Sequence, residues 1–409
     1  MDTTDNGTDL RQERGRLLSL DKRIKNVAGV TWVVPSQTSE TAYLVNTKEG
    51  TCSCPDYELR RCRCKHQWAV TFSQTVETDS AGNTTLTQSF SYSRTTARDW
   101  NAINASQCEE KTVVQQLLRG LCEGVATPAH TGRGPKPIPL SDVVFAMTMK
   151  TYSLMSARRA TTDIEAAAEE GSMTRAPHYN STLAAFSKPE MTAILTSLIE
   201  RSAAPLASVE RSFAVDSTGF GTCVYHRWID EKYGKPCRRA TWLKAHAMVG
   251  TATQIITSVK VTTSEGADCP QLPKLVESTK QRFDMDEVSA DRAYLSNENL
   301  TAIEAAGAAP FVPFKINSQK DGSPAWRKMH AVFMLKEEEF LAAYSKRSSV
   351  ESTFSSLKRK FGPAVKSRTF TAQVNEILCK VLCHNLSCLV MAMHKLAIEP
   401  SFLSKTVAA

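Results

Sequence analysis

The sequence predicts a mixed α/β protein, in which a mixed sheet covered by helices follows a helical region and a small metal-binding ββα module. Three observations lead to this fold class. Short apolar runs separated by turn residues fill residues 212–263, as in an antiparallel meander. Helical and strand patterns then alternate over residues 273–361, which favours a mixed sheet with helices on its faces. Near the N-terminus, cysteines and a histidine directly follow a predicted hairpin.

The composition is that of an ordinary globular protein. The chain has 409 residues, enough for two or three domains, with 42% hydrophobic and 22% charged residues. Its net charge of +8 fits a polyanionic partner without requiring one. The N-terminus is polar, and no run of about 18 apolar residues occurs, so we expect no signal peptide and no membrane span. We expect a cytoplasmic location, where the twelve cysteines remain thiols or metal ligands.

The first 75 residues are expected to form a flexible tail, residues 1–25, and a zinc module, residues 26–75. Apolar runs at 32–34 and 42–45 flank a turn-forming stretch and predict a hairpin. Four potential ligands then follow in the pattern C-x-C-x9-C-x-H: Cys52, Cys54, Cys64 and His66. Two close pairs of sulfur and nitrogen donors suit tetrahedral Zn²⁺, and four protein ligands leave no open position, so the role is structural. Cys62 is a further thiol that leaves the third ligand open, and a coincidental cluster is the alternative.

This pattern resembles the SWIM zinc finger, in which a hairpin and a C-x-C precede a spacer and a C-x-H that opens a helix. The apolar residues after His66 suit that helix. The spacer and the start of the helix carry basic residues, namely Arg60, Arg61, Arg63 and Lys65. The basic run favours contact with DNA, although the module could equally contact protein or present a solvated face.

Residues 76–139 are interpreted as a linker. Its first part is rich in Thr, Ser and Asn and predicts a linker or loose hairpin, and residues 109–121 predict a short helix. The Gly/Pro-rich stretch 127–139 is expected to mark the main domain boundary. Residues 140–208 predict several helices with basic residues between them. They are either a DNA-end-binding region of the helix-turn-helix type or a bundle that supports the next domain.

The last domain is expected to span residues 209–398, with a tail at 399–409. A strand is predicted at 212–220, in which Asp216 stands at the end of the first apolar run. Further strands are predicted at 223–230, 241–250 and 254–262. A helix at 273–282 leads to a strand that carries Asp291, then to a helix at 297–308 and a strand at 308–314. A long helix and an apolar buried helix near 377–396 follow. The polar stretch 316–329 is the candidate for a short insertion.

Residues 344–358 form the most informative segment. On one α-helix, four functional side chains would share a sector about 60° wide, and four apolar side chains would form an adjacent stripe. The functional set is Tyr344, Arg347, Glu351 and Lys358, and the apolar set is Val350, Phe354, Leu357 and Phe361. Residues 340–370 contain seven Lys/Arg and one acidic residue, Glu351, whose pKa nearby cations would lower. An amphipathic helix with a solvated basic face is the alternative.

The spacing Y-(2)-R-(3)-E-(6)-K resembles the motif of DDE transposases from bacterial and archaeal insertion sequences. The stretches VDSTGF, WLKAH, ADRAYLS and FVPFK support the resemblance over residues 140–396. It implies an RNase H-like fold in which Asp216, Asp291 and Glu351 hold two Mg²⁺ or Mn²⁺ ions, with Asp216 bridging both. It also implies that Tyr344, Arg347 and Lys358 hold DNA phosphates.

The same resemblance implies a function. The chain would cleave DNA phosphodiesters and transfer strands, acting on double-stranded transposon ends and target DNA as a nucleoid-associated homodimer. Two alternatives remain open: a nuclease that cuts without joining, and a domesticated or decayed relative that only binds DNA. Lys244 and His246 are interpreted as core or sheet-surface residues, and Asp284 and Asp286 as turn residues.

Overall fold

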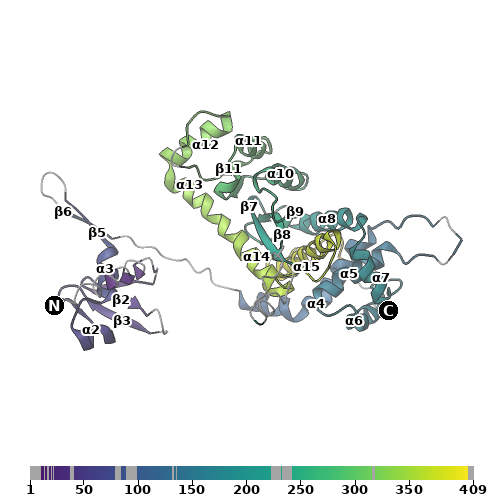
Figure 1. Cartoon of the computed structure of the whole chain (residues 1–409), viewed down its shortest axis with the longest axis horizontal. Coiled ribbons are helices and arrows are strands. Elements are labelled where there is room, and N and C mark those ends of the chain that lie inside the picture. Colours follow the sequence, from purple (N-terminus) through teal and green to yellow (C-terminus); the bar gives the residue numbers. More distant parts are fainter. Residues whose placement is uncertain are drawn as a thin grey trace. The chain divides into compact units, whose positions relative to one another are not determined.

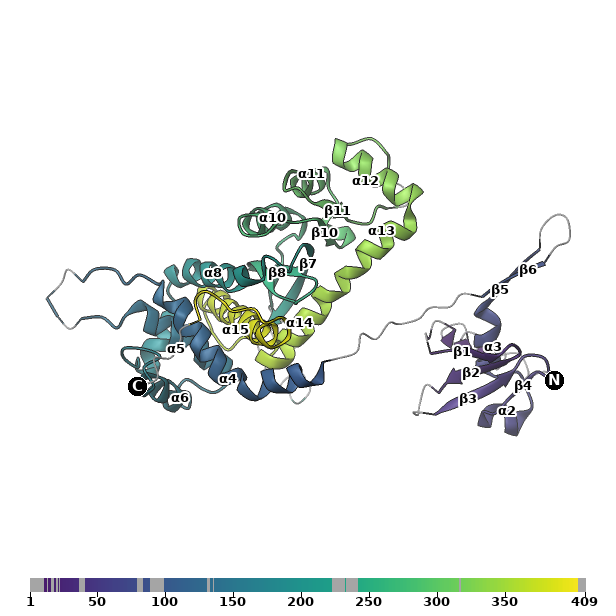
Figure 2. The same cartoon turned by 180° about the vertical axis from the view of Figure 1, so that it is seen from behind.

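The computed structural model describes residues 11–12, 14–15, 18–19, 21, 23–36, 41–78, 84–88, 99–130, 133–134, 136–222, 232, 242–315 and 318–403. They form two compact units, Met1–Arg98 and Asp99–Ala409 (Figures 1 and 2).

Unit 1 contains the predicted ββα arrangement within a larger sheet. Its four antiparallel strands follow the chain order: β1 (Lys25–Ala28), β2 (Thr31–Pro35), β3 (Ala42–Asn46) and β4 (Thr51–Cys52). The predicted hairpin is β2–β3, in which Trp32 pairs with Val45. Two helices follow, α2 (Pro55–Arg60) and α3 (Lys65–Phe72), and then the hairpin β5 (Gln74–Thr78) and β6 (Thr84–Gln88). The hairpin interpretation of the Thr-rich segment is therefore confirmed for these residues.

Unit 2 begins with helix α4 (Trp100–Glu123), which is longer than the predicted short helix. The Asp99 carboxylate caps it by accepting a 3.0 Å hydrogen bond from the Ala102 N–H. Its apolar face, which includes Val114, Leu117 and Leu121, is buried and packs against α15. The compact unit therefore begins at Asp99, and the Gly/Pro-rich stretch 127–139 lies within it instead of at its boundary.

The predicted helical region is built into the core of unit 2. Four helices occupy it: α5 (Leu140–Tyr152), α6 (Thr161–Glu169), α7 (Tyr179–Phe186) and α8 (Glu190–Ala203). The helix α8 packs against strand β9 and against α15, and α5 packs against α4, α7 and α15. Their buried side chains join one core with those of the sheet. This packing supports the alternative in which these helices support the domain that follows.

The sheet of unit 2 is mixed, as predicted, with the order β11-β10-β7-β8-β9. The strands are β7 (Ser212–Gly221), β8 (Trp242–Gly250), β9 (Ile256–Thr263), β10 (Glu287–Ala290) and β11 (Ala309–Phe311). The first three pair antiparallel, whereas β10 runs parallel to both β7 and β11. Helices α10 (Leu272–Lys280) and α11 (Asn297–Ala305) lie between the strands in sequence, as predicted. The strand predicted at 223–230 lies outside the described residues.

The C-terminal helices differ from prediction in two places. The polar stretch expected as a short insertion leads into α12 (Pro324–Leu335), which Ser323 caps by accepting from the Trp326 N–H. The predicted single helix is divided into α13 (Glu337–Tyr344), the 3-10 turn η4 (Ser345–Arg347) and α14 (Ser348–Phe361). The Ser345 hydroxyl bonds back to the Ala342 carbonyl, a local bond that competes with regular helix. In both views α13 and α14 run end to end (Figures 1 and 2). The apolar stripe of α14 is buried as predicted.

Helix α15 (Phe370–Leu396) is the central helix of this core. By length and composition alone it could cross a membrane, but 72% of its most apolar window is buried inside the protein. Its buried polar groups also have partners within the fold. Lys380 donates to the Gly362 and Ala364 carbonyls, and Asn385 bonds the backbone of Ile256. These features are typical of the core helix of a globular domain.

Buried His384 on α15 predicts that acid destabilises the protein. Its Nε2 lies 2.9 Å from the Gln254 carbonyl, and burial lowers its pKa to about 4. An unfolded histidine has a pKa of about 6.5, so between these values the unfolded chain binds a proton that the folded chain excludes. The free energy of unfolding therefore falls as pH decreases through this window, and at about pH 5 it is lower by about 2 kcal/mol than near neutral pH.

The measurement is urea unfolding near neutral pH and at about pH 5. His384→Gln should remove about 2 kcal/mol of the difference between the two conditions, because glutamine does not titrate. His130→Gln is the matched control, since His130 is exposed in the connector. An unchanged pH effect in His384→Gln would contradict the assignment.

Candidate active site and metal centre

Asp216 lies on β7, and Asp291 directly follows the neighbouring parallel strand β10. Ala290, the last residue of β10, pairs with Val215 of β7, so the residue that follows each of them is an aspartate. Adjacent strands lie about 4.8 Å apart, which keeps the two carboxylates close. Asp291 then caps the 3-10 turn η3 (Arg292–Tyr294), where its Oδ1 accepts a 2.6 Å bond from the Arg292 N–H.

Glu351 reaches the same region from the first turn of α14, which packs on β7 and β8. The link between the elements is Arg347, at the end of η4. Its Nη1 donates to Asp216 Oδ2 at 2.8 Å, and its Nη2 donates to Glu351 Oε1 at 2.7 Å. One guanidinium thus holds a strand carboxylate and a helix carboxylate together. The spacing of Arg347 and Glu351 along a helix predicted that these two residues are close, but it did not predict the bond from Arg347 to Asp216.

The charge balance at Asp216 is unfavourable for a bare carboxylate. Burial raises its pKa, and the nearby charges of Asp291 and Glu351 act in the same direction. The Ser217 N–H, 2.8 Å from Oδ1, and the guanidinium of Arg347 act against this rise. The donor set consists of carboxylate oxygens, which suit Mg²⁺ or Mn²⁺. A divalent cation would relieve the repulsion, so these residues fit the ions expected of them.

Tyr344 lies at the edge of this site. The Arg347 guanidinium is 5.8 Å from the centre of its ring. A pocket of about 440 Å³ opens beside it and reaches Asp291. The other lining residues are Arg292, Pro313, Phe333, Glu337 and Leu341. The sequence patterns gave no indication that these residues line a pocket.

Lys358 lies apart from the other three motif residues. Its ammonium group is 5.5 Å from the centre of the Phe220 ring, and burial lowers its pKa. Asp216 and Phe220 occupy alternate positions of β7 and therefore face the same side of the sheet, towards α14. The four motif residues lie on this side of the sheet. They do not form one sector of a single helix, as predicted, but come from α13, η4 and α14.

Lys244 and His246 belong to the opposite face of the sheet. His246 pairs with Ser217, whose side chain points away from that of Asp216. Both side chains contact Asp268, at 3.1 Å from Lys244 Nζ and 3.2 Å from His246 Nδ1. The interpretation of Lys244 and His246 as core or sheet-surface residues is confirmed. Asp286 lies at the far end of β10, where it pairs with Arg211 at 2.7 Å.

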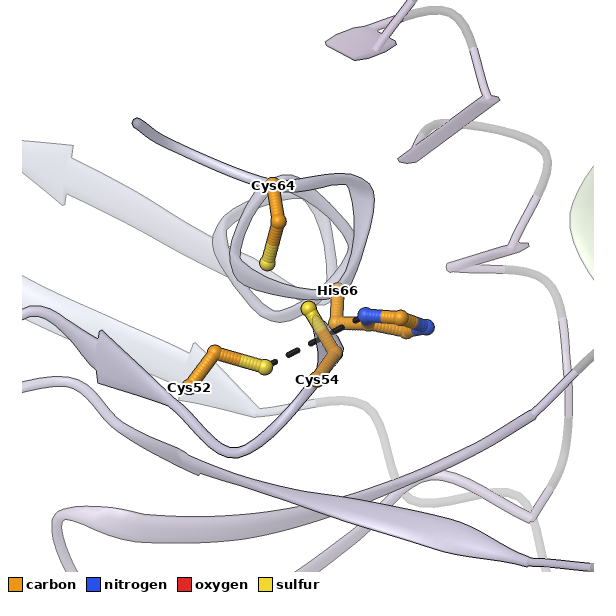
Figure 3. Close-up of side chains that lie close together, drawn as sticks. All are labelled: Cys52, Cys54, Cys64 and His66. Carbon is orange, nitrogen blue, oxygen red and sulfur yellow. Dashed lines mark hydrogen bonds between the residues drawn. The ribbon is translucent and has the colours of Figure 1, made fainter. Parts of the chain in front are cut away.

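The four predicted zinc ligands lie together in unit 1 (Figure 3). Cys52 ends β4, Cys54 caps α2, Cys64 caps α3, and His66 follows in the first turn of α3. All four are buried, and their potential ligand atoms lie within 4.8 Å of one another. His66 Nδ1 faces the sulfurs, 4.0 Å from Cys52 Sγ. Cys62 is half-buried and lies outside the group, so the structure brings Cys64 into the cluster.

The chemistry of this cluster fits zinc. Tetrahedral coordination with Zn–S bonds of about 2.3 Å separates the sulfurs by about 3.8 Å, slightly less than the observed spread. A hydrogen bond with Cys52 lowers the pKa of the Cys64 thiol, which favours its thiolate form. Thiolate is the form that binds metal. Among the described residues, no set of three carboxylates is as compact as this cysteine and histidine cluster. In the predicted carboxylate site, Arg347 lies between Asp216 and Glu351.

Part of the chain matches a known protein family. Residues 207–386 match the family model of the transposase DDE domain. The matched range contains Asp216, Asp291 and Glu351 and the three other motif residues, and it excludes unit 1. No curated protein matches the chain. The match over residues 207–386 therefore supports the assignment of this domain to the DDE transposases, DNA-acting enzymes that use divalent metal ions.

Proposed function

We propose that the chain is a DNA transposase that cuts the ends of an insertion sequence and joins them to target DNA. One observation carries the proposal. Within the matched domain, Asp216 lies on β7, Asp291 directly follows the parallel neighbour β10, and Arg347 bonds both Asp216 and Glu351. Three carboxylates from two strands and a helix are the ligand set that a pair of Mg²⁺ or Mn²⁺ ions requires in phosphoryl transfer. When bound, such ions stabilise the attacking and leaving oxygens of the phosphodiester.

The residues of the chain would have distinct roles. Asp216, between the other two acids, would contact both ions, with Asp291 and Glu351 each holding one. Arg347 offers a planar fork that can bind a phosphate bidentately. Lys358 lies about 10 Å from Glu351 along the helix axis, so it would meet a neighbouring phosphate. Tyr344 borders the pocket beside Asp291 and would contact the DNA strand there.

The zinc module belongs to the same proposal. The cluster of three cysteines and His66 would hold one structural Zn²⁺ in a SWIM-type finger. Arg60, Arg61 and Arg63 are exposed beside it and would give it a basic surface for DNA. Double-stranded DNA, as transposon ends and as target, would be the main partner. A homodimer would bind the two ends, in the cytoplasm at the nucleoid.

The test uses purified full-length protein and DNA that carries the flanks of its own gene, with Mg²⁺ or Mn²⁺. The expected result is metal-dependent cleavage at the element ends, followed by joining of the new 3′-OH ends to a target duplex. Cleavage without joining would instead indicate a nuclease. Tight binding without cleavage would favour a protein that only binds DNA.

A further inference from the structure

Arg347 occupies the position between two of the proposed metal ligands. Its guanidinium bonds Asp216 Oδ2 and Glu351 Oε1 at 2.8 and 2.7 Å. The other Asp216 oxygen, Oδ1, accepts from the Ser217 N–H. Both Asp216 oxygens therefore accept hydrogen bonds, and Oδ2 is the one that shares the guanidinium with Glu351. A cation bridging Asp216 and Glu351 would have to replace this guanidinium.

Arg347 also lies where the backbone can change. It ends the 3-10 turn η4, between α13 and α14, and it precedes the first residue of α14. Short 3-10 segments have poorer hydrogen-bond geometry than α-helix, and within a long helix they often mark a hinge. The Arg347 side chain is 19% exposed, whereas that of Glu351 is 59% exposed. A small rotation at η4 would therefore turn the guanidinium from the carboxylates towards a ligand at the open side of the site.

We propose that Arg347 is a switch that couples DNA binding to metal binding, an inference that rests on the function proposed above. In the resting protein, Arg347 occupies the space between Asp216 and Glu351, offsets one of their two negative charges and blocks the metal. A DNA backbone phosphate draws the guanidinium away, because it offers the same paired oxygens as the carboxylates. The freed carboxylates then bind the divalent ions. The protein thereby keeps its catalytic ions away from the site until DNA arrives.

Thermodynamic linkage gives the proposal a quantitative form. If DNA raises the affinity for metal by some factor, metal raises the affinity for DNA by the same factor. Couplings of this kind are typically about 5–150-fold. Removing the guanidinium should raise metal affinity without DNA and abolish the effect of DNA. A salt bridge that DNA leaves intact would also give tighter metal binding once the guanidinium is removed, but it would leave the metal affinity of the wild type unchanged by DNA.

The experiment measures Mn²⁺ binding by electron paramagnetic resonance on zinc-loaded, full-length protein, with and without a short mixed-sequence DNA duplex. The site is identified as the Mn²⁺ signal that Asp216→Asn removes. In the wild type, DNA should raise the affinity of this site by about 5–150-fold. Arg347→Gln without DNA should bind Mn²⁺ about as tightly as the wild type with DNA. Arg347→Lys, which keeps the charge but loses the fork, should shift in the same direction.

Lys346→Gln is the matched control for loss of one positive charge. Lys346 precedes Arg347 in the same turn but pairs with Glu287, outside the carboxylate site. It should retain the wild-type response to DNA. The switch is overturned if DNA leaves the wild-type affinity unchanged, or if DNA still raises the affinity of Arg347→Gln. If Asp216-dependent Mn²⁺ binding is absent with and without DNA, the proposed active site itself fails, and the switch fails with it.

Discussion

Replacing Asp216 with asparagine should reduce DNA cleavage by more than about 100-fold, because substitutions that only disturb the support of a metal ligand already cost about 10–100-fold. Asparagine keeps the shape of the side chain but removes the charge that a divalent ion needs. It also leaves an oxygen that can accept from the Ser217 N–H or Arg347. The fold should survive, since burial disfavours the charged form of Asp216 in the native protein. Cleavage of end-containing DNA and DNA binding are measured on the same preparations.

Asp291→Asn and Glu351→Gln should have the same outcome, with DNA binding retained in both. The matched control is Asp286→Asn, because Asp286 lies at the other end of β10 and pairs with Arg211 on the surface. It should cleave at the wild-type rate. Normal cleavage by any one of the three active-site variants would show that the triad is misassigned.

Much of unit 2 could be predicted because its strands and helices carry local patterns. β7 has a short apolar run directly before Asp216, β10 ends directly before Asp291, and α14 has a complete apolar stripe. These patterns fix which face of each element is buried, and hence which side of β7 carries Asp216. The helix α10 between β9 and β10 accounts for the direction of β10, which runs parallel to β9 and hence to β7, but not for the choice of β7 as its neighbour.

The features that the sequence did not predict depend mostly on contacts between distant segments. The N-terminal half of α4 is polar, so its helical signal is weak, and its length follows from packing on α15. The break at η4 involves a serine that bonds its own backbone, which helical periodicity does not report. The bond between Arg347 and Asp216 joins residues 131 positions apart. Helical spacing placed Arg347 beside Glu351, and the family resemblance assigned it to phosphate, but neither indicated its bond to Asp216.

The cysteine cluster shows the opposite case, in which a short pattern predicted a three-dimensional site. Each pair of ligands is fixed by local structure: Cys52 and Cys54 flank the end of β4, and Cys64 and His66 open α3. Only the approach of α3 to the sheet is non-local. Sequence could not choose between Cys62 and Cys64, because that choice depends on where the helix begins.

Removing the metal from this cluster should unfold unit 1 and leave unit 2 intact. Among the described residues, the buried core of unit 1 has nine members, and three of them are the cysteines of the cluster. Such a small core cannot offset the conformational entropy of the sheet and helices by itself. Structural Zn²⁺ contributes about 10–16 kcal/mol in comparable small modules. The core of unit 2 contains none of these residues.

The change is Cys52→Ser or His66→Ala, and elemental analysis should show the loss of about one zinc per chain. Hydrogen exchange should then lose protection across residues 26–75, while the amides of α15 and the sheet of unit 2 stay protected. A chelator should reproduce this pattern in the wild type. Cys62→Ser is the matched control, because Cys62 lies in the same segment but outside the cluster, and it should keep both the zinc and the protection. Unchanged zinc content and exchange in Cys52→Ser would show that these four residues hold no structural metal.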